Sequence, residues 1–455
     1  KITEDKAIFS LRFDGFTPVI PISIATGQKV ANFLNLLEFN APIHFVNSFD
    51  DYLFKYRAIA TDLVYGKTVI LSNGSLGKAM RASSSISLLL SPVVIDTLLL
   101  VDGGLVANVP VNIAKNMGCN LIIAANATSP LNTREELSYP WNIADQMVSI
   151  PMNIITNKHI ENADFLINPD LENLKNSDFS KIKASISEGY YSALEIADSI
   201  KKSYSILFKS SLKMNNKTLN NYSFITDDTF VKNELSKKFM GIKEIEINDL
   251  MFELYSLFCI GDYKDLWIEH VYDRGNNKLY INAEYNPIVK SINVKGVTKL
   301  NLGFVDSLFS ALKNKPYNSK LLNKKLLTLL QTYRSAGYSL AEISSVGFNN
   351  NTNEIFVNAK EGKIDKIILE GNNQTNDDII LREFVIKEGD DFVYNKIEKG
   401  LIGLRSSNFF DDIDVSVFKD DTLNILKIKV IERNPAVLRF GLKIDNENQT
   451  QISLD

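Results

Sequence analysis

Short apolar runs alternate with segments of helical periodicity through the first 200 or so residues. The runs 56–60, 98–101 and 121–125 have the length and the polar boundaries of buried strands. Apolar residues at helical spacing predict helices over 29–37 and 113–117 and a longer amphipathic helix over 182–204. This alternation of strands and helices predicts an α/β domain over residues 1–205.

A polar stretch follows this domain. Residues 206–221 are rich in Ser, Lys and Asn and lack apolar periodicity, which predicts a linker. We therefore expect limited proteolysis to cut first within 209–221.

From residue 222 onward the chain repeats itself. Val289-x-x-Ile292-x-Val294-x-Gly296 recurs as Ile364-x-x-Ile367-x-Leu369-x-Gly371. A helix end followed by Gly or Asn and an aromatic residue occurs three times, and the aromatic positions 263, 338 and 409 are 75 and 71 residues apart. Alternating strands close the copies at 278–283, 354–359 and 423–430. These patterns predict three α+β modules of one strand, two helices and two strands, at 222–287, 288–363 and 364–434.

The last segment, 435–455, continues in strand-like alternation. Residues 437–444 alternate apolar and polar side chains, and residues 451–454 follow after a polar stretch. The pattern predicts two strands joined by a turn, either the start of a larger sheet or an ordinary terminal hairpin.

Composition narrows the function classes. The 455 residues suggest about three domains. A net charge of -4 gives no excess of positive charge of the kind that nucleic-acid binding needs. Cys119 lies in the apolar run 117–124, which predicts a buried, inert thiol rather than a bridge to Cys259. His44, His159 and His270 are isolated, so no metal site and no cofactor are expected.

The ends of the chain and its apolar runs carry a further interpretation. Lys1 is not a start methionine, no basic-then-apolar signal segment follows it, and no apolar run reaches 18 residues. We interpret the chain as a fragment cut at both ends, without a transmembrane helix.

The sharpest chemical signal is the run Leu99-Leu-Val-Asp102-Gly-Gly. An aspartate at the end of an apolar strand, followed by Gly103 and Gly104, places a carboxylate on a tight turn. Asp-Gly-Gly alone is typical of structural turns. Its neighbours in the sequence are Ala60-Thr-Asp-Leu63, Gly66-Lys-Thr-Val-Ile-Leu71, Ala79-Met-Arg-Ala-Ser83, Ser91-Pro-Val93 and Met117-Gly-Cys-Asn-Leu-Ile-Ile123.

In this order and spacing, the motifs over about 20–200 resemble the patatin family of lipid acyl hydrolases. The resemblance implies a partial three-layer α/β fold and a serine–aspartate dyad acting on phospholipid or other acyl esters. Asp102 is then the family's general base, and Gly103 and Gly104 support its turn. The scarcity of histidine is consistent with a dyad that needs none.

The serine of that dyad is expected in a Gly-x-Ser-x-Gly elbow preceded by a glycine-rich oxyanion loop. Neither is present, and Asn73-Gly-Ser75-Leu-Gly77 is only a near match. The serine-rich cluster at 83–87 predicts the start of a helix with capping serines. No nucleophile is therefore assigned, and the chain is expected to be inactive as given.

The three modules resemble POTRA domains, the periplasmic units that precede Omp85-type outer-membrane barrels. This resemblance implies that 435–455 begins such a barrel, with apolar side chains facing lipid. It also implies the outer membrane of a Gram-negative bacterium, periplasmic POTRA modules, and periplasmic chaperones or the barrel-assembly machinery as partners.

Three interpretations remain open. The chain is part of a phospholipase A-type hydrolase tethered to the outer membrane, which we favour. Alternatively it is a pseudoenzyme whose patatin-like domain binds a ligand, or a POTRA–barrel factor for protein translocation or assembly.

Overall fold

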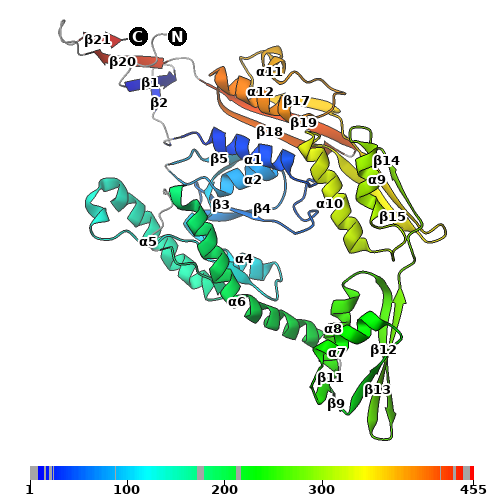
Figure 1. Ribbon diagram of the computed structural model, residues 1–455. Coiled ribbons are helices and arrows are strands. Elements are labelled where there is room, and N and C mark those ends of the chain that lie inside the picture. The colour runs from blue at the N-terminus through cyan, green and yellow to red at the C-terminus, as the bar shows by residue number, and fades with distance from the viewer. Residues whose placement is uncertain are drawn as a thin grey trace. The chain divides into compact units, whose positions relative to one another are not determined.

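The computed structural model describes residues 9–14, 17–19, 23, 25–87, 89–171, 179–211, 217–420, 422–433, 437–443 and 451–454. Figure 1 shows their helices and strands. The chain divides into two compact units, one of residues 1–106, 331–342 and 361–455 and the other of residues 107–330 and 343–360.

An antiparallel sheet lies at the centre of the N-terminal part of the first unit. Its strand order is β4-β3-β6-β5, with β3 Ala58–Asp62, β4 Lys67–Leu71, β5 Val93–Ile95 and β6 Leu98–Asp102. All of β3 is buried. Helices α1 Gln28–Asn40 and α2 Leu76–Ser83 contact each other, and α2 contacts β3 and β6. The predicted strands at 56–60 and 98–101 are thus confirmed to within two residues, and the helix predicted at 29–37 is confirmed to within three.

The second unit begins with a smaller α/β portion. It contains α4 Val111–Asn116, β7 Ile123–Ala125, η2 Glu136–Ser138, α5 Pro140–Ile160, β8 Phe165–Ile167, η3 Phe179–Lys181 and α6 Ile182–Ser211. The short α3 Gly104–Ala107 precedes α4. Strands β7 and β8 pair in parallel, and Val109, Val111, Ile122 and Ala124 form a small core.

Two expectations for this portion need correction. The predicted linker at 206–221 is partly regular structure, because α6 continues to Ser211 and β9 begins at Thr218. Residues 212–216 lie outside the described chain. Cys119 is exposed rather than buried, because the chain turns after α4 and only the later part of the apolar run enters the core.

Helix α5 carries an uncovered apolar stripe. Ile143, Met147, Ile150 and Ile154 recur at intervals of three or four residues, and their exposed fractions are 47%, 71%, 43% and 66%. Side chains at this spacing share one face of a helix. Within the described part of the chain, therefore, nothing covers this face of α5.

The repeated region forms three modules of the predicted type. The first consists of β10 Tyr222–Ile225, α7 Thr229–Lys238, β11 Glu244–Glu246, α8 Ile247–Phe258, β12 Tyr263–Asp273 and β13 Asn276–Tyr285. The second consists of β14 Ser291–Lys295, α9 Leu302–Ser310, α10 Ser319–Ser335, β15 Glu342–Asn349 and β16 Glu354–Lys360. The third consists of β17 Lys366–Glu370, α11 Asp377–Phe384, α12 Tyr394–Ser406, β18 Phe410–Asp420 and β19 Leu423–Glu432.

The sheets of the modules share one topology. Their orders are β10-β13-β12, β14-β16-β15 and β17-β19-β18, and in each the first strand runs parallel to the last. The first module adds a two-stranded sheet of β9 Thr218–Asn220 and β11. The predicted order of one strand, two helices and two strands is therefore confirmed, with this addition in the first copy.

The repeated glycine that follows the first strand has a steric cause. Gly296 and Gly371 have φ angles of 80° and 88°. A Cβ atom on either would lie 2.0 Å from the carbonyl oxygen of Ala359 or Val430 on the last strand of its module. In the first module β10 ends at Ile225, and Thr226 rather than glycine follows it.

One hydrophobic core joins the N-terminal part to the third module. Phe39 of α1 and Phe45 are buried among side chains of the third module, and the Phe39 and Phe392 ring centroids are 5.1 Å apart. Helix α1 contacts both α12 and β18. By contrast, the core of the first module consists only of residues between 219 and 283.

A buried arginine strengthens the same junction. The Arg334 guanidinium, near the end of α10, donates to the carbonyl oxygens of Ala41 and Ile43, each at 2.9 Å. Burial lowers the pKa of Arg334 to about 10. The group is still charged at neutral pH, so each of these carbonyls has a cationic donor.

The C-terminal strands pair with the N-terminal ones. Strands β1 Phe9–Asp14, β2 Thr17–Val19, β20 Val437–Lys443 and β21 Gln451–Leu454 form a sheet of order β2-β1-β20-β21. The predicted strands at 437–444 and 451–454 are present and antiparallel, and residue 444 itself lies outside the described chain. Among the described residues, no helix has the length and apolar character to cross a membrane.

Candidate functional site

Asp102 is the last residue of β6, opposite Ala60 of β3. Its backbone N–H donates to the Ser85 carbonyl at 2.9 Å. Its own carbonyl accepts from the Thr61 hydroxyl at 2.9 Å. The peptide units on both sides of Asp102 are therefore held, which limits the positions that its side chain can take.

The Asp102 carboxylate is half-buried. One oxygen, Oδ1, accepts from the backbone N–H of Gly104 at 2.7 Å. Burial raises the pKa of Asp102 above its ordinary value, and the Gly104 hydrogen bond partly opposes this. A carboxylate with raised proton affinity is better suited to accept a proton than an ordinary exposed one.

Glycine at 103 is required by the approach of β3. A Cβ atom there would lie 2.3 Å from the Ile59 carbonyl oxygen and 2.7 Å from the Ile59 carbonyl carbon. Gly104 contributes its N–H to Asp102 and begins α3. The two glycines thus have different roles in one turn.

Arg81 organises the chain around this turn. Its buried guanidinium donates to the carbonyl oxygens of Thr26 at 3.1 Å and Ser91 at 3.0 Å, and to the Ser85 hydroxyl. Burial lowers the pKa of Arg81, and the Asp412 carboxylate opposes this effect. Since Ser85 also accepts from the Asp102 N–H, Arg81 supports the position of Asp102 through one intervening residue.

The sequence pattern did not assign this role to Arg81. A signal was available, because Arg81 lies between Ala79 and Ala82, which are both fully buried. A charged residue at a buried position of a short helix is usually paired or hydrogen-bonded.

The candidate serines have structural roles. Ser75 caps α2, because its hydroxyl accepts from the Lys78 N–H at 3.2 Å. Ser83 is the last residue of α2 and donates to the Ile59 carbonyl at 2.7 Å. The expectation that 83–87 begins a helix is wrong, since the helix starts at the Ser75 cap and ends in this cluster. Within the described chain, no serine hydroxyl hydrogen-bonds to the Asp102 carboxylate.

The described residues provide no alternative centre for metal chemistry. No group of three or more His, Cys, Asp or Glu side chains among them could hold a metal ion. Cys119 and Cys259 are both free and exposed.

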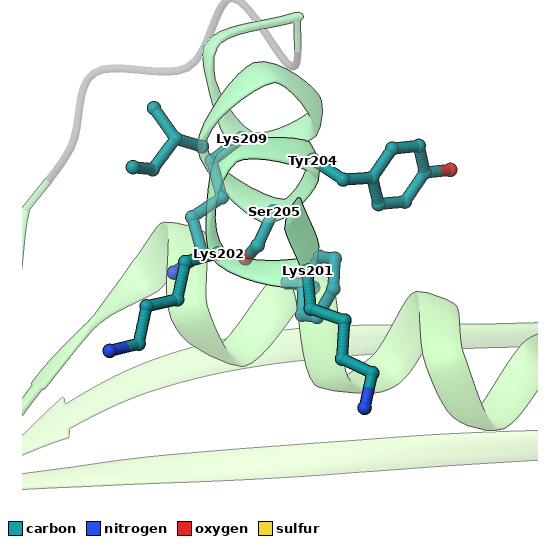
Figure 2. Close-up of a pocket in the computed structure, with 7 residues that line it drawn as sticks. Lys201, Lys202, Tyr204, Ser205 and Lys209 are labelled. Carbon is teal, nitrogen blue, oxygen red and sulfur yellow. The ribbon is translucent and has the colours of Figure 1, made fainter. Parts of the chain in front are cut away.

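A separate cleft lies between α6 and α8 in the second unit (Figure 2). Its volume is about 530 Å³, and it is lined by Lys201, Lys202, Tyr204, Ser205, Ile206, Lys209 and Phe252. Ser205 and Tyr204 are the hydroxyl-bearing residues of this lining, and no imidazole or carboxylate accompanies them. The cleft therefore has the character of a binding surface rather than of an acyl-transfer centre.

Comparison with known families agrees with this geometry. Residues 22–115, which contain Arg81 and Asp102, match the patatin-like phospholipase family. Residues 362–433, the third module, match the POTRA family, described as a surface antigen variable number repeat.

Similar proteins divide between the same two groups. The outer membrane protein assembly factor BamA of Nitratidesulfovibrio vulgaris is 30% identical over 155 residues, covering 32% of this chain and 19% of that protein. Lysophospholipase NTE1 of Yarrowia lipolytica is 30% identical over 97 residues, covering 20% and 7%. The mouse patatin-like phospholipase domain-containing protein 7 is 28% identical over 121 residues, covering 26% and 9%. The chain thus spans less than a fifth of the length of these curated relatives.

Solved structures similar to this chain include two Omp85 fragments. The N-terminal domain of Omp85 from Thermosynechococcus elongatus aligns with a TM-score of 0.39 at 15% identity, covering 48% of this chain and all of that one. POTRA domains 1–3 of Omp85 from Anabaena align with a TM-score of 0.38 at 17% identity, covering 49% and 98%. From its family matches and its related proteins, this chain is a fusion of a patatin-like phospholipase domain with POTRA domains.

Proposed function

We propose that the chain supplies the base-bearing part of a serine lipid acyl hydrolase, with Asp102 as the general base. The observation that carries the proposal is the position of Asp102 within the patatin-like segment. Its backbone is fixed by Ser85 and Thr61, and burial raises the pKa of its carboxyl group. Such a group can take up a proton during attack on an ester and return it later.

In the proposed reaction a serine hydroxyl attacks the acyl carbonyl. As the new C–O bond forms, the hydroxyl proton passes to the Asp102 carboxylate. The ester C–O bond then breaks, and the alcohol leaves with that proton. Water, deprotonated by the same carboxylate, then attacks the acyl-enzyme carbonyl. The bond between the acyl carbon and the serine oxygen breaks, the proton passes from Asp102 to that oxygen, and the fatty acid is released.

The attacking serine and the oxyanion donors are proposed to lie outside this chain. The sequence has no Gly-x-Ser-x-Gly elbow, and Ser75 caps a helix. The uncovered apolar stripe on α5 supports a further protein segment, because a stripe of that length is normally covered. The 455-residue chain alone is then inactive.

The POTRA modules suggest where the enzyme acts. We propose that they are periplasmic, that β20 and β21 lead into an outer-membrane barrel, and that the hydrolase domain is tethered through them. Likeness to an outer membrane protein assembly factor supports outer-membrane or barrel-assembly machinery as a partner. The acyl substrate itself would be a phospholipid or another acyl ester.

The decisive experiment restores an upstream segment that carries the serine elbow. We expect no turnover of a chromogenic ester and no fluorophosphonate labelling by the 455-residue chain, and both in the restored protein. Asp102→Asn in the restored protein should lower turnover by about 10³-fold or more, because the base is lost while the side-chain size is kept.

Asp96→Asn is the matched control for this change. Asp96 is exposed in the turn before β6, and its φ angle of 53° is one that Asn adopts readily. Turnover should be unchanged in this control. If Asp102→Asn keeps more than about a tenth of the rate, Asp102 is only a turn residue.

A second function is favoured by the three tandem modules and the likeness to BamA. The chain would then be part of a translocation or assembly factor with a non-catalytic patatin-like domain. In that case outer-membrane protein assembly would depend on the modules, and Asp102→Asn in the restored protein would have no effect in cells.

A further inference from the structure

The second of the three POTRA modules differs in charge from its neighbours. Residues 288–363 contain 11 lysines and arginines but only four aspartates and glutamates, which gives a net charge of +7. Residues 222–287 contain seven basic and 12 acidic residues, and residues 364–434 contain ten and 15, so each of these modules has a net charge of -5. The overall charge of -4 therefore conceals one strongly basic module between two acidic ones.

The basic residues of this module gather where acidic residues are missing. Between Asp306 and Glu342 the sequence has no aspartate or glutamate over 35 residues, yet it has five lysines and one arginine. The arginine, Arg334, is buried and hydrogen-bonded to carbonyl groups. The surface charge therefore comes from the five lysines, which lie in the connection from α9 to α10 and in the first two turns of α10.

Two of these lysines share the outer face of α10. Lys320 and Lys324 are four residues apart, and Leu327 follows three residues later, so all three lie on one side of the helix. Both lysines are exposed, and Leu327 is 43% exposed. The opposite side of α10 carries the buried side chains Leu322, Leu326 and Leu329. One side of a single helix thus presents two ammonium groups and an aliphatic side chain to solvent.

The positive charge of this face is not neutralised within the chain. Lys313 and Lys315, in the connection that leads into α10, are exposed as well. Within the described part of the chain, no carboxylate lies within ion-pairing distance of these two lysines or of Lys320 and Lys324. All four ammonium groups are therefore available to an external anion.

The residue types on this face favour an anionic lipid surface over other anions. Lysine ammonium groups are point charges that suit an array of head groups, whereas bidentate recognition of a single phosphate is typical of arginine. An aliphatic side chain such as Leu327 gains from the boundary between head groups and acyl chains, which a soluble polyanion does not offer. Residues 319–328 include no aromatic side chain on which nucleic-acid bases could stack.

We propose that the α10 face formed by Lys320, Lys324 and Leu327, together with Lys313 and Lys315, binds the anionic head groups of a phospholipid membrane. The helix stays at the surface of the bilayer, because its apolar side is already buried in the module. Each lysine close to an anionic surface adds about fivefold to the affinity. This binding goes beyond the proposed hydrolysis and requires no catalytic activity.

The test measures co-flotation of the full 455-residue chain with lipid vesicles. Vesicles of phosphatidylcholine with about 30% phosphatidylglycerol should bind the chain at least about tenfold more tightly than vesicles of phosphatidylcholine alone, since the lysines face an anionic surface. In about 1 M NaCl, where the Debye length falls to about 3 Å, this difference should disappear.

Lys320→Glu/Lys324→Glu should weaken binding to the anionic vesicles by at least about tenfold, since it replaces attraction by repulsion. Lys232→Glu/Lys237→Glu should bind as the wild type does. It is the matched control, because it makes the same change in net charge at exposed positions of α7 in the acidic first module. Leu327→Gln should weaken binding by about threefold, because less apolar surface leaves water. Circular dichroism checks that all three variants remain folded.

Three outcomes would overturn the proposal. Equal binding to anionic and neutral vesicles would indicate apolar adsorption through another surface. Equal binding by the two double variants would show that net charge or another surface, and not the α10 face, governs binding. Binding of a polyglutamate peptide that depends on Lys320 and Lys324, without binding to anionic vesicles, would indicate an acidic protein partner. Vesicle binding as expected by a restored protein that shows no turnover would support membrane binding and contradict only the hydrolase proposal.

Discussion

At the scale of single residues, the Asp-Gly-Gly turn combines a chemical and a steric requirement. Asp102 needs a fixed backbone to present its carboxylate, and the adjacent glycine allows β3 to approach. The Ile59 carbonyl oxygen would lie 2.3 Å from a Cβ atom at position 103. The motif therefore has a structural function in this chain whether or not the carboxylate is catalytic.

Gly103→Ala should destabilise the first unit by about 1–3 kcal/mol, as overpacking in a filled interior usually does. Gly189→Ala is the control, because Gly189 is inside α6 with open space around its Cβ position. That change should be neutral or stabilise by up to about 1 kcal/mol. Denaturant unfolding measures both variants, and equal effects would show that Ile59 can move aside.

Glu38 gives the second prediction at this scale. Burial raises the pKa of its carboxyl group from the ordinary 4.5 to about 7, and the nearby Asp414 carboxylate adds to the effect. The Gly77 N–H, which donates to Glu38 at 2.9 Å, opposes it. The folded chain thus binds this proton more tightly than the unfolded chain does. The associated stability is fully present below about pH 4.5 and is lost as the pH rises through about 7.

Between pH 5 and pH 8 we expect the unfolding free energy of the wild type to fall by about 2–3 kcal/mol more than that of Glu38→Gln. The glutamine keeps an oxygen that can accept from Gly77 but cannot ionise. Glu234→Gln, at an exposed position of α7, should not change the pH dependence. Denaturant titrations at each pH measure the unfolding free energy, and hydrogen exchange of α2 reports the stability of this region. Parallel pH profiles of the unfolding free energy for wild type and Glu38→Gln would contradict the prediction.

At the scale of elements, some residues that resemble catalytic residues in the sequence instead stabilise the ends of helices. Ser75 lies in a near match to a nucleophile elbow, yet its hydroxyl accepts from the Lys78 N–H at the start of α2. Similarly, the third module uses Asn408 with a φ angle of 61° where the first two use Gly261 and Gly337 at 99° and 89°. Asn tolerates this left-handed conformation better than most residues, so the turn between the second helix and the next strand of the module keeps its conformation without glycine.

Ser75→Ala should lower the stability of the first unit by about 1 kcal/mol, the usual cost of losing an N-cap. Ser75→Asp should restore most of it, because aspartate is an equally good cap. In the restored enzyme neither change should reduce turnover by more than about twofold, since a cap lies outside the chemistry. Loss of fluorophosphonate labelling in both variants would instead identify Ser75 as the nucleophile.

At the scale of the whole molecule, the modules differ in how independent they are. The first module has a core of its own, whereas the third shares its core with Phe39 and Phe45 from the N-terminal part. The packed unit that contains the third module therefore also includes residues 1–106, which lie outside the family match at 362–433.

Phe39→Ala should destabilise the third module by about 3–5 kcal/mol, because it leaves a cavity beside Phe392. Hydrogen exchange resolved by module should then speed up in α12 and β18 and remain unchanged in α7 and α8. Leu235→Ala, in the core of the first module, is the control with the reverse pattern. If Phe39→Ala leaves α12 and β18 unaffected, the shared core does not contribute to stability.

The sequence by itself determined the order of the modules and most of the helices and strands within them. Strand and helix positions in the repeats follow from local periodicity, and the glycine after each of the last two opening strands is visible because sterics allow no alternative there. The Asp-Gly-Gly turn could likewise be read locally, since a strand end and two glycines are adjacent in sequence.

The tertiary structure decided which side chains these elements bring together. Arg81 and Ser85 lie near Asp102 only because α2 packs on β6, and Phe39 enters the third module over a separation of more than 300 residues. The α6–α8 cleft also joins two elements that look unrelated in sequence. Contacts of this kind depend on burial and packing between distant segments, which no local pattern of apolar and polar residues encodes.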